Sequence, residues 1–369
     1  MDDDKTKEVK YLMTLNFNNM YKKISLWISL FLLTGLIPVF SAVSSKSVAK
    51  KKENGARISI LDSQSNSVLE VSIEELLTGA IAAEMPASYP IEALKAQGVA
   101  IFTYFLRSNG FNQVISLNAN DDSSKRRYIK NFCYKSKSQR RDLWGKKFDK
   151  YENKIKGAVK DIKGKALYYD DKIAFTPFFS WCYKETVPCH IGFWQKLPYL
   201  ISVSSPECDD KALKDKKITV KIDKSEMQDI LEKKFPNKKK QLKSTDPSKW
   251  IKINDKTKNG YIIKVEVLGE KIKGSKFESL LKLPSANFSM SYDSKSKTFE
   301  ISSVGYGHGV GMSQHGAKHF AYKGWKYDQI LSHYYPGTEI KEIPLQNKSN
   351  KESVNKIDDV LLKMLKNKT

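Results

Sequence analysis

The chain has 369 residues, of which 64 are Lys or Arg and 41 are Asp or Glu, so its formal net charge is +23. Because 40% of the residues are hydrophobic and 11% are aromatic, the chain can bury a sizeable core, which excludes wholesale disorder. The sequence has no series of long hydrophobic spans, which excludes a channel or transporter, and its charge favours an anionic partner: nucleic acid, anionic lipid or an acidic polymer.

An uncharged apolar stretch at residues 24–43 follows Lys22 and Lys23 directly. A basic flank, an apolar run and an exit of small residues are typical of an export signal, and a run of about 20 residues is also long enough for a membrane anchor. We therefore assign residues 1–44 to a tail with a signal peptide or anchor, and residues 45–56 to a linker. Because basic residues before a span stay inside, we expect the rest of the chain to be exported, either membrane-anchored or secreted.

The following segments predict a mixture of strands and helices. Residues 57–71 indicate two short strands around a Ser/Asn-rich turn. Ser72 and Glu75 fit a capping box, which opens a helix over about residues 73–83. A second helix over about residues 91–107 is apolar on nearly every face, so we expect it to be buried.

The remainder of the chain continues this mixed pattern. Residues 151–163 predict another helix, and residues 166–208 carry strand-like runs together with three of the four cysteines. Residues 209–300 are rich in lysine and predict a second lobe with short helices and strands. The fold class that we expect is α+β, with a two-lobed domain over residues 57–343 and a basic tail over residues 344–369.

Four of the five histidines fall within residues 308–333. Just before and among them, alternate positions are glycine, which lets the backbone approach another group closely: Gly305, Gly307, Gly309 and Gly311. The segment lacks G-x-G-x-x-G and H-E-x-x-H, which excludes a nucleotide-binding loop and a zinc protease of the common types. His315 and His319 could share a helix face, where two solvated histidines are a simpler interpretation than a metal pair.

Glu84 is a lone carboxylate in an apolar stretch at the end of the first predicted helix. Burial would raise its pKa toward the range useful for general acid catalysis, whereas an exposed helix end would leave it an ordinary surface residue. Lys95 in the apolar second helix needs a carboxylate partner, because an unpaired buried charge is costly. Glu84 or Glu92 could supply that carboxylate. The same helix offers Gln97 and Tyr104, which can bind hydroxyl or amide groups.

The cysteines follow no standard metal pattern. Cys182, Cys189, His190 and Cys208 form C-x6-CH-x17-C, which is not a usual zinc spacing. In an exported chain we expect one or two disulfides, with Cys133 pairing with the odd cysteine. Free thiols are the next alternative and a zinc site at these four residues is the least favoured. We therefore expect no cofactor.

Two segments of the chain together resemble one known family. They are EELLTGAIAAEMPASYPIEALKAQGVAIFTYFL and GYGHGVGMSQHGAKHFAYKGWKYDQILSHYYPGT, which lie about 200 residues apart. In this order, behind a signal or anchor, they resemble the stage II sporulation protein D (SpoIID) family with its amidase-enhancer (LytB) relatives. Weaker similarity fills most of the interval, so that the resemblance covers roughly residues 57–340.

The resemblance implies a function and a set of site residues. Members of the family are peptidoglycan lytic transglycosylases that act during engulfment in spore formers, and Glu84 matches their catalytic glutamate. The other matches, which the resemblance implies to bind or orient the substrate, are Lys95, Gln97, Tyr104, His308, Ser313 and Gln314. We expect the glycine-rich segment to bring His308 and Gln314 close to Glu84, although more than 220 residues separate them.

The implied chemistry needs a single carboxyl group. An internal hydroxyl of the substrate attacks in place of water, so the second carboxylate of the usual glycosidase scheme is not required. The implied partners are peptidoglycan glycan strands, a wall amidase, other sporulation membrane proteins and the membrane itself, but no nucleic acid. A non-catalytic wall-binding protein that stimulates an amidase is the alternative. Phe102 stands where the family usually has Arg, and we expect it to pack in the core rather than face a sugar.

Overall fold

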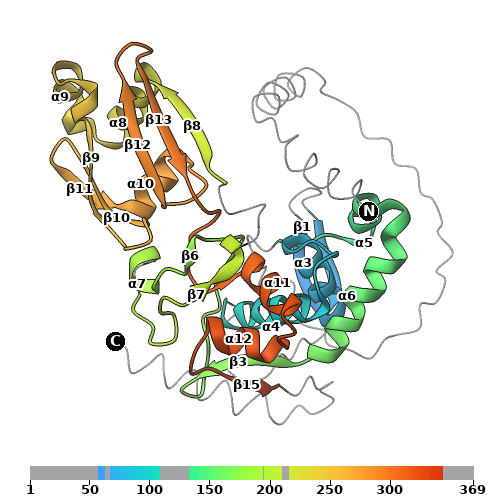
Figure 1. Cartoon of the computed structure of the whole chain (residues 1–369). Coiled ribbons are helices and arrows are strands. Elements are labelled where there is room, and N and C mark those ends of the chain that lie inside the picture. The colour runs from blue at the N-terminus through green and yellow to red at the C-terminus, as the bar shows by residue number, and fades with distance from the viewer. Residues whose placement is uncertain (1–56, 63–66, 109–132, 194, 210–215, 344–369) are drawn as a thin grey trace, which may run out of the picture. The chain divides into compact units, whose positions relative to one another are not determined.

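Figure 1 shows the computed structural model of the chain, coloured where its residues are described. The described ranges are residues 57–62, 67–108, 133–193, 195–209 and 216–343. The predicted signal or anchor, the linker and the basic tail lie outside them. Within these ranges no helix is both long and apolar enough to cross a membrane.

The main lobe is built from both ends of the described chain. Its elements, in chain order, are β1 (Arg57–Asp62), β2 (Ser67–Ser72), α3 (Ile73–Glu84), α4 (Ile91–Ser108), α5 (Lys137–Trp144), α6 (Phe148–Ile162), β3 (Lys165–Tyr169), β4 (Lys172–Ile173), β5 (Phe178–Phe179), β6 (Lys184–Glu185), α7 (Cys189–Gly192), β7 (Ser204–Ser205), β14 (Met312–Ser313), α11 (Gln314–Tyr322), α12 (Tyr327–Tyr334) and β15 (Glu339–Glu342). Together with the second lobe they confirm the predicted α+β class.

The first helix begins and ends as the sequence predicts. Strands β1 and β2 pair as an antiparallel hairpin, and Ser72 then accepts the backbone N–H of Glu75 at 3.1 Å to cap α3. In a full capping box the carboxylate of Glu75 would accept the backbone N–H of Ser72. Here this carboxylate instead binds Tyr134 and Arg140. The helix ends at Glu84, because Met85 is extended and Pro86 follows. Glu84 is thereby placed at the last helical position.

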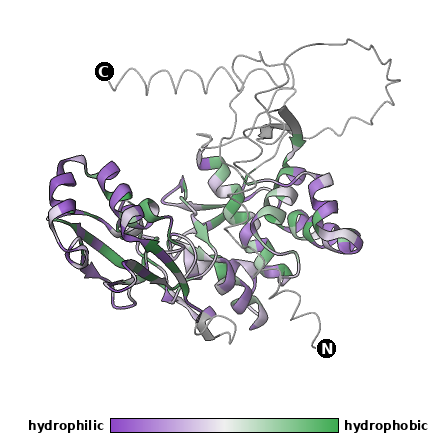
Figure 2. Cartoon of the chain, turned by 90° about the horizontal axis from the view of Figure 1, so that it is seen from above, coloured by the Kyte–Doolittle hydropathy of each residue, from purple (hydrophilic) through white to green (hydrophobic). Residues whose placement is uncertain are grey.

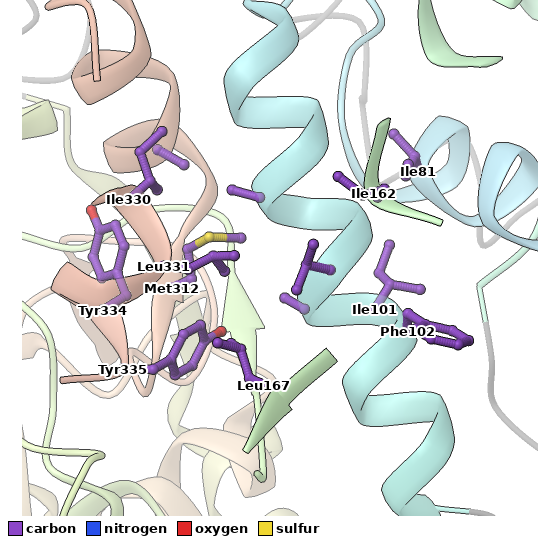
Figure 3. Packing of buried hydrophobic residues seen from close by; sticks show 14 of the residues in the cluster. Ile81, Ile101, Phe102, Ile162, Leu167, Met312, Ile330, Leu331, Tyr334 and Tyr335 are labelled. Atoms are coloured by element: carbon purple, nitrogen blue, oxygen red, sulfur yellow. The ribbon is translucent and has the colours of Figure 1, made fainter. Parts of the chain in front are cut away.

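Helix α4 is the centre of the main lobe. Twelve of its 18 residues are buried, because α3, α6, α11, α12 and β3 pack around it. Figure 3 shows this packing, with Ile101 and Phe102 on α4 and with Leu331 and Tyr335 from the C-terminal part of the chain. Each large apolar side chain that is fully buried here contributes about 1.5–3 kcal/mol. The prediction of a buried second helix is confirmed.

The sheets of the main lobe are small. Strand β3 pairs antiparallel with β15 and β4, β6 pairs antiparallel with β7, and β5 pairs in parallel with β14. Of the strand-like runs expected in residues 166–208, the run at 199–203 forms no strand, and that expectation is wrong. The N–H of Leu200 bonds within a turn to Leu197, and its carbonyl oxygen accepts from Cys189, so its polar groups are used outside a ladder.

The second lobe has its own hydrophobic core. Its elements are β8 (Ile218–Asp223), α8 (Lys224–Lys234), α9 (Lys239–Ser244), β9 (Ile251–Lys256), β10 (Ile262–Val267), β11 (Glu270–Lys273), α10 (Gly274–Leu281), β12 (Phe288–Asp293) and β13 (Thr298–Ser303). They form two three-stranded antiparallel sheets, β11-β10-β9 and β12-β13-β8. Trp250, Phe277 and Phe299 are fully buried between these elements. Figure 2 shows the alternation of hydrophobic and hydrophilic segments along these strands and helices.

Candidate functional site

Glu84 is half-buried at the C-terminal end of α3. Burial raises the pKa of its carboxyl group, and hydrogen bonds with the side chains of Cys133 and Gln314 lower that pKa in part. A carboxyl group whose charged form is disfavoured by burial keeps its proton to a higher pH, which is what a general acid requires. The environment expected for Glu84 from the sequence is therefore present.

Gln314 reaches Glu84 from the far end of the chain. It is the first residue of α11, and its Nε2 also donates to Oε1 of Gln97 at 3.4 Å. The two segments that resemble the family thus meet at Glu84, as expected for Gln314. An amide nitrogen has two hydrogens, so donation to both Glu84 and Gln97 leaves the Oε1 of Gln314 as an acceptor for other groups.

Gln97 supports the site from inside the core. Its side chain is completely buried on α4. From the sequence we expected Gln97 to bind or orient the substrate, and its burial excludes direct contact. Its Oε1 instead fixes the orientation of the Gln314 amide, while its Nε2 has no hydrogen-bond partner within the described residues. Gln97 is therefore placed to orient Gln314.

The glycine-rich segment brings α11 into position. All four alternate glycines have positive φ, between +77° and +103°. At Gly311 a Cβ atom would lie only 2.0 Å from the carbonyl oxygen of Pro177, so the close approach of these two chains requires glycine. Gly307 and Gly309 line a cavity of about 350 Å³ together with Trp181, Val187 and Tyr261, among others. The backbone of this segment therefore does face an open space.

Among the described residues, the contacts of His308 do not include Glu84. Its Nδ1 accepts the N–H of Val310 at 3.1 Å, and the ring also hydrogen-bonds to the backbone of Phe178. Its ring packs against those of Phe179 and Phe193. Burial lowers the pKa of His308 to about 4, so the ring is neutral at ordinary pH. The ring thus bonds within its own segment at Val310 and to β5 at Phe178, which helps to hold the glycine-rich segment against that strand.

Ser313 is also a structural partner. It is fully buried and caps α11 by accepting the N–H of Gly316 at 3.1 Å. Its hydroxyl group donates to Oε1 of Glu207 at 2.6 Å. The hydroxyl group is therefore committed to neighbours inside the fold.

The two remaining expected residues lie on the less buried positions of α4. Lys95 pairs with Glu92 at 3.0 Å and with Asp161 at 2.8 Å. Of the two partners considered from the sequence, the structure thus selects Glu92 and adds Asp161. Tyr104 is 39% exposed, and its ring lies beside that of Phe175. It is the expected site residue that is most accessible to a polymeric ligand.

Phe102 belongs to the core. Only 1% of its surface is exposed, which confirms the expectation of core packing and excludes contact between its ring and a sugar. An arginine placed at this position would therefore point into the core and not into a groove.

Cys133 is the neighbour of Glu84 that sequence reasoning missed. The residue is exposed overall, but its thiol hydrogen-bonds to Glu84. Partial burial and the charge of Glu84 raise the pKa of Cys133 to about 11, so the thiol keeps its proton and acts as a donor. No pattern in the sequence connects these two residues, because the contact depends on how the chain folds back onto α3.

A buried arginine holds this part of the chain in place. Arg140 is completely buried and binds two carboxylates, that of Glu152 at 2.9 Å and that of Glu75 at 2.9–3.1 Å. Tyr134 donates to the same Glu75 at 3.0 Å, and its ring occupies the space where a Cβ of Gly79 would lie. These contacts fix the residues that directly follow Cys133 along α3 and so place the thiol at the end of that helix.

The expected disulfides do not form among three of the four cysteines. Cys133 and Cys189 are free thiols, and the thiol of Cys182 lies 3.6 Å from Oε1 of Glu207, to which it donates. The side chain of Cys208 lies outside the described residues, so the possible four-residue zinc set cannot be assembled here. His190 is exposed. Among the described residues, no three His, Cys, Asp or Glu side chains are grouped to hold a metal ion.

Similarity to known proteins covers most of the chain. The family profile described as stage II sporulation protein matches residues 62–169, which include Glu84. The chain is 31% identical to stage II sporulation protein D of Bacillus subtilis (strain 168) over 309 residues, covering 82% of this chain and 85% of that protein. It is 32% identical to stage II sporulation protein D of Bacillus amyloliquefaciens over 294 residues, covering 79% and 80%.

A more distant relative carries a different name. The amidase enhancer of Bacillus subtilis (strain 168) is 25% identical over 322 residues, which cover 72% of this chain and 40% of that protein. Identity above 30% over most of both chains, together with the joining of both resembling segments at Glu84, identifies the family. The chain belongs to the stage II sporulation protein D (SpoIID) family, whose members are linked to sporulation and to amidase enhancement.

Proposed function

We propose that the chain is an exported peptidoglycan lytic transglycosylase, which cleaves the MurNAc–GlcNAc bond of glycan strands during engulfment in sporulation. The observation that supports this proposal most strongly is the environment of Glu84. Its carboxyl group is half-buried with a raised pKa and is held by donors from two distant segments of the chain. Such a group serves first as an acid and then as a base.

In the proposed reaction Glu84 gives its proton to the glycosidic oxygen as the bond from that oxygen to C1 of MurNAc breaks. The C6 hydroxyl group of the same MurNAc attacks C1 and forms the new C1–O6 bond. Its proton passes to the carboxylate of Glu84, which restores the acid. No water is consumed, so one carboxyl group suffices where hydrolysis uses two. We propose that the Oε1 of Gln314, whose amide nitrogen donates to Gln97 and Glu84, accepts a hydroxyl or amide hydrogen of the sugar.

The net charge of +23 supports binding to the anionic polymers of a cell wall, since opposite charges raise the local concentration of a polymeric substrate. We propose that the N-terminal segment keeps the protein at the outer face of the cytoplasmic membrane or releases it there. In this setting the membrane, a wall amidase and other sporulation membrane proteins are its expected neighbours.

A second candidate is a wall-binding protein that stimulates an amidase without cleaving glycan. The similarity to the amidase enhancer of Bacillus subtilis favours this function. So does Phe102, because a buried phenylalanine stands where the resemblance leads one to expect an arginine in the site.

Cleavage of isolated glycan strands by the purified full-length chain separates the two candidates. The Glu84→Gln variant should lose about 10²–10⁴-fold in rate, the usual contribution of a general acid. A matched control is Glu278→Gln, because burial also raises the pKa of Glu278, which lies in the second lobe. This control should keep its activity. Near-normal turnover by Glu84→Gln contradicts the proposal, and a wild-type chain that only accelerates an amidase supports the second candidate.

A further inference from the structure

The proposed reaction does not use Glu207, a buried carboxylate beside the first turn of α11. Glu207 belongs to the short 3-10 helix η3 (Pro206–Asp209), and only 1% of its surface is exposed. Burying a carboxylate without partners is costly, so its hydrogen bonds show what holds it there. These bonds all converge on one oxygen atom.

Oε1 of Glu207 accepts the hydroxyl group of Ser313 at 2.6 Å and the backbone N–H of Cys182 at 2.9 Å. Both distances lie within the ordinary range of hydrogen bonds, and the one to Ser313 is the shorter. Oε2, in contrast, has no hydrogen-bond partner in the part of the chain that the structure describes. The polar contacts of this carboxylate are thus directed to the loop at Cys182 and to the first turn of α11.

The bond to Ser313 decides how α11 begins. The hydroxyl group of Ser313 has one hydrogen and two acceptors in reach, Oε1 of Glu207 at 2.6 Å and the carbonyl oxygen of Ser180 at 3.3 Å, of which Glu207 is the nearer. Its lone pair accepts the N–H of Gly316 at 3.1 Å and so caps the helix. Gln314, the next residue, starts the helix with its side chain on Glu84.

Gly316 allows this close approach. A Cβ atom at Gly316 would lie 1.8 Å from the hydroxyl oxygen of Tyr334, 2.7 Å from Oγ of Ser205 and 3.0 Å from Oε2 of Glu207. The three oxygen atoms therefore occupy the space beside the backbone that a side chain would need. The first turn of α11 is packed directly against the carboxylate of Glu207.

We propose that Glu207 is a positioning residue of the Glu84 site: it holds the cap at Ser313 and thereby places the amide of Gln314 against Glu84. Its catalytic consequence rests on the proposed function, whereas the contacts themselves do not. Glu207 acts only through these neighbours, because its burial keeps it from any substrate.

Two substitutions that keep the side chain of residue 207 about as long test this role in the full-length chain. Glu207→Gln keeps an oxygen that can accept from Ser313 and Cys182, while Glu207→Met removes both acceptors. The readouts are the titration of the Glu84 carboxyl carbon by ¹³C NMR and the pH dependence of glycan cleavage. Glu84→Gln identifies the NMR signal. Cys133, the titratable side chain that hydrogen-bonds to Glu84, stays unchanged in every variant.

Glu207→Gln should resemble the wild type in both readouts. Glu207→Met should lose about 10²-fold in rate, the effect of a displacement of about 1 Å in a catalytic site. The pKa of Glu84 should rise further, because the hydrogen bond from Gln314 that lowers it is lost. The loss of activity on the alkaline side should therefore move to higher pH. Ser313→Ala removes the other partner and should move the titration in the same direction, which keeps the test available where Glu207→Met does not fold.

A control separates positioning from general destabilisation. Phe299→Leu lies in the core of the second lobe and should lower stability without moving the titration of Glu84. An unchanged titration in both Glu207→Met and Ser313→Ala overturns the inference, as does equal impairment of the Gln and Met variants. Because NMR needs no turnover, a shifted titration in a chain that cleaves no glycan contradicts the proposed function and leaves this inference standing.

Discussion

At the scale of single residues, the site is a carboxyl group with donors from two directions. Glu84 could be predicted from the sequence, because it is the carboxylate of an apolar helix end. Its partner Cys133 could not, since their contact depends on the buried Arg140, which anchors the chain that follows Cys133. His308 was expected in the site because its motif is recognisable, but a motif does not show which atoms a ring nitrogen binds.

The burial of Glu84 should be visible in stability as well as in activity. Its pKa is raised in the folded state, so between the unfolded and folded pKa values the folded chain holds more protons, and stability falls as pH rises through this window. Glu84→Gln has no carboxyl group to deprotonate, so this loss of stability is absent in the variant. The variant should therefore unfold at higher urea concentration than the wild type above the window and at the same concentration below the ordinary carboxyl pKa of about 4.3. Equal midpoints at every pH would show that the carboxyl group is not destabilised by burial.

Substitutions at Phe102 test the hydrophobic core around α4. Phe102→Arg places a charge where no water reaches, so it should cost more than the about 3–5 kcal/mol expected for the matched control Phe102→Ala. Thermal unfolding followed by circular dichroism measures both. A stable Phe102→Arg variant with raised glycan cleavage would contradict the buried position of this side chain.

At the scale of elements, helices were predicted better than short strands. The cap of α3 and the apolar runs of α3 and α4 are local signals, so the bounds of these helices agree with the structure. The two-residue strands β5 and β14 are defined only by their pairing with each other. This pairing could not be predicted from the local sequence. The strand expected at residues 199–203 failed for the same reason, because an apolar run does not reveal whether a ladder partner is present.

The close approach of Gly311, before β14, to Pro177, before β5, leads to another prediction. Gly311 has φ +79° and lies against Pro177, so Gly311→Ala combines an unfavourable backbone conformation with a collision against backbone atoms. It should lower the melting temperature and reduce glycan cleavage by displacing α11. Gly269→Ala is the matched control, since Gly269 also has positive φ but has no other atom within 4 Å of the Cβ position. Equal effects of the two substitutions would mean that the close approach at Pro177 is unimportant.

At the scale of the whole molecule, segments from opposite ends of the chain share one core around α4, and a lysine-rich lobe with a separate core lies between them in sequence. The two family segments were recognisable because each is a continuous stretch. Glu207 was not, since its partner Ser313 is 106 residues away and the sequence around it carries no motif. Contacts of this range are set by the tertiary fold and could be located only in the structure.

The central claim, that Glu84 drives cleavage without water, is tested most directly by mass spectrometry of glycan strands digested by the purified full-length chain. A transglycosylase leaves 1,6-anhydroMurNAc ends, which lack one water relative to the reducing ends that hydrolysis produces. The account predicts anhydro ends from the wild type, their loss in Glu84→Gln and their persistence in Glu278→Gln. Reducing ends from the wild type, or anhydro ends formed at an undiminished rate by Glu84→Gln, would contradict it.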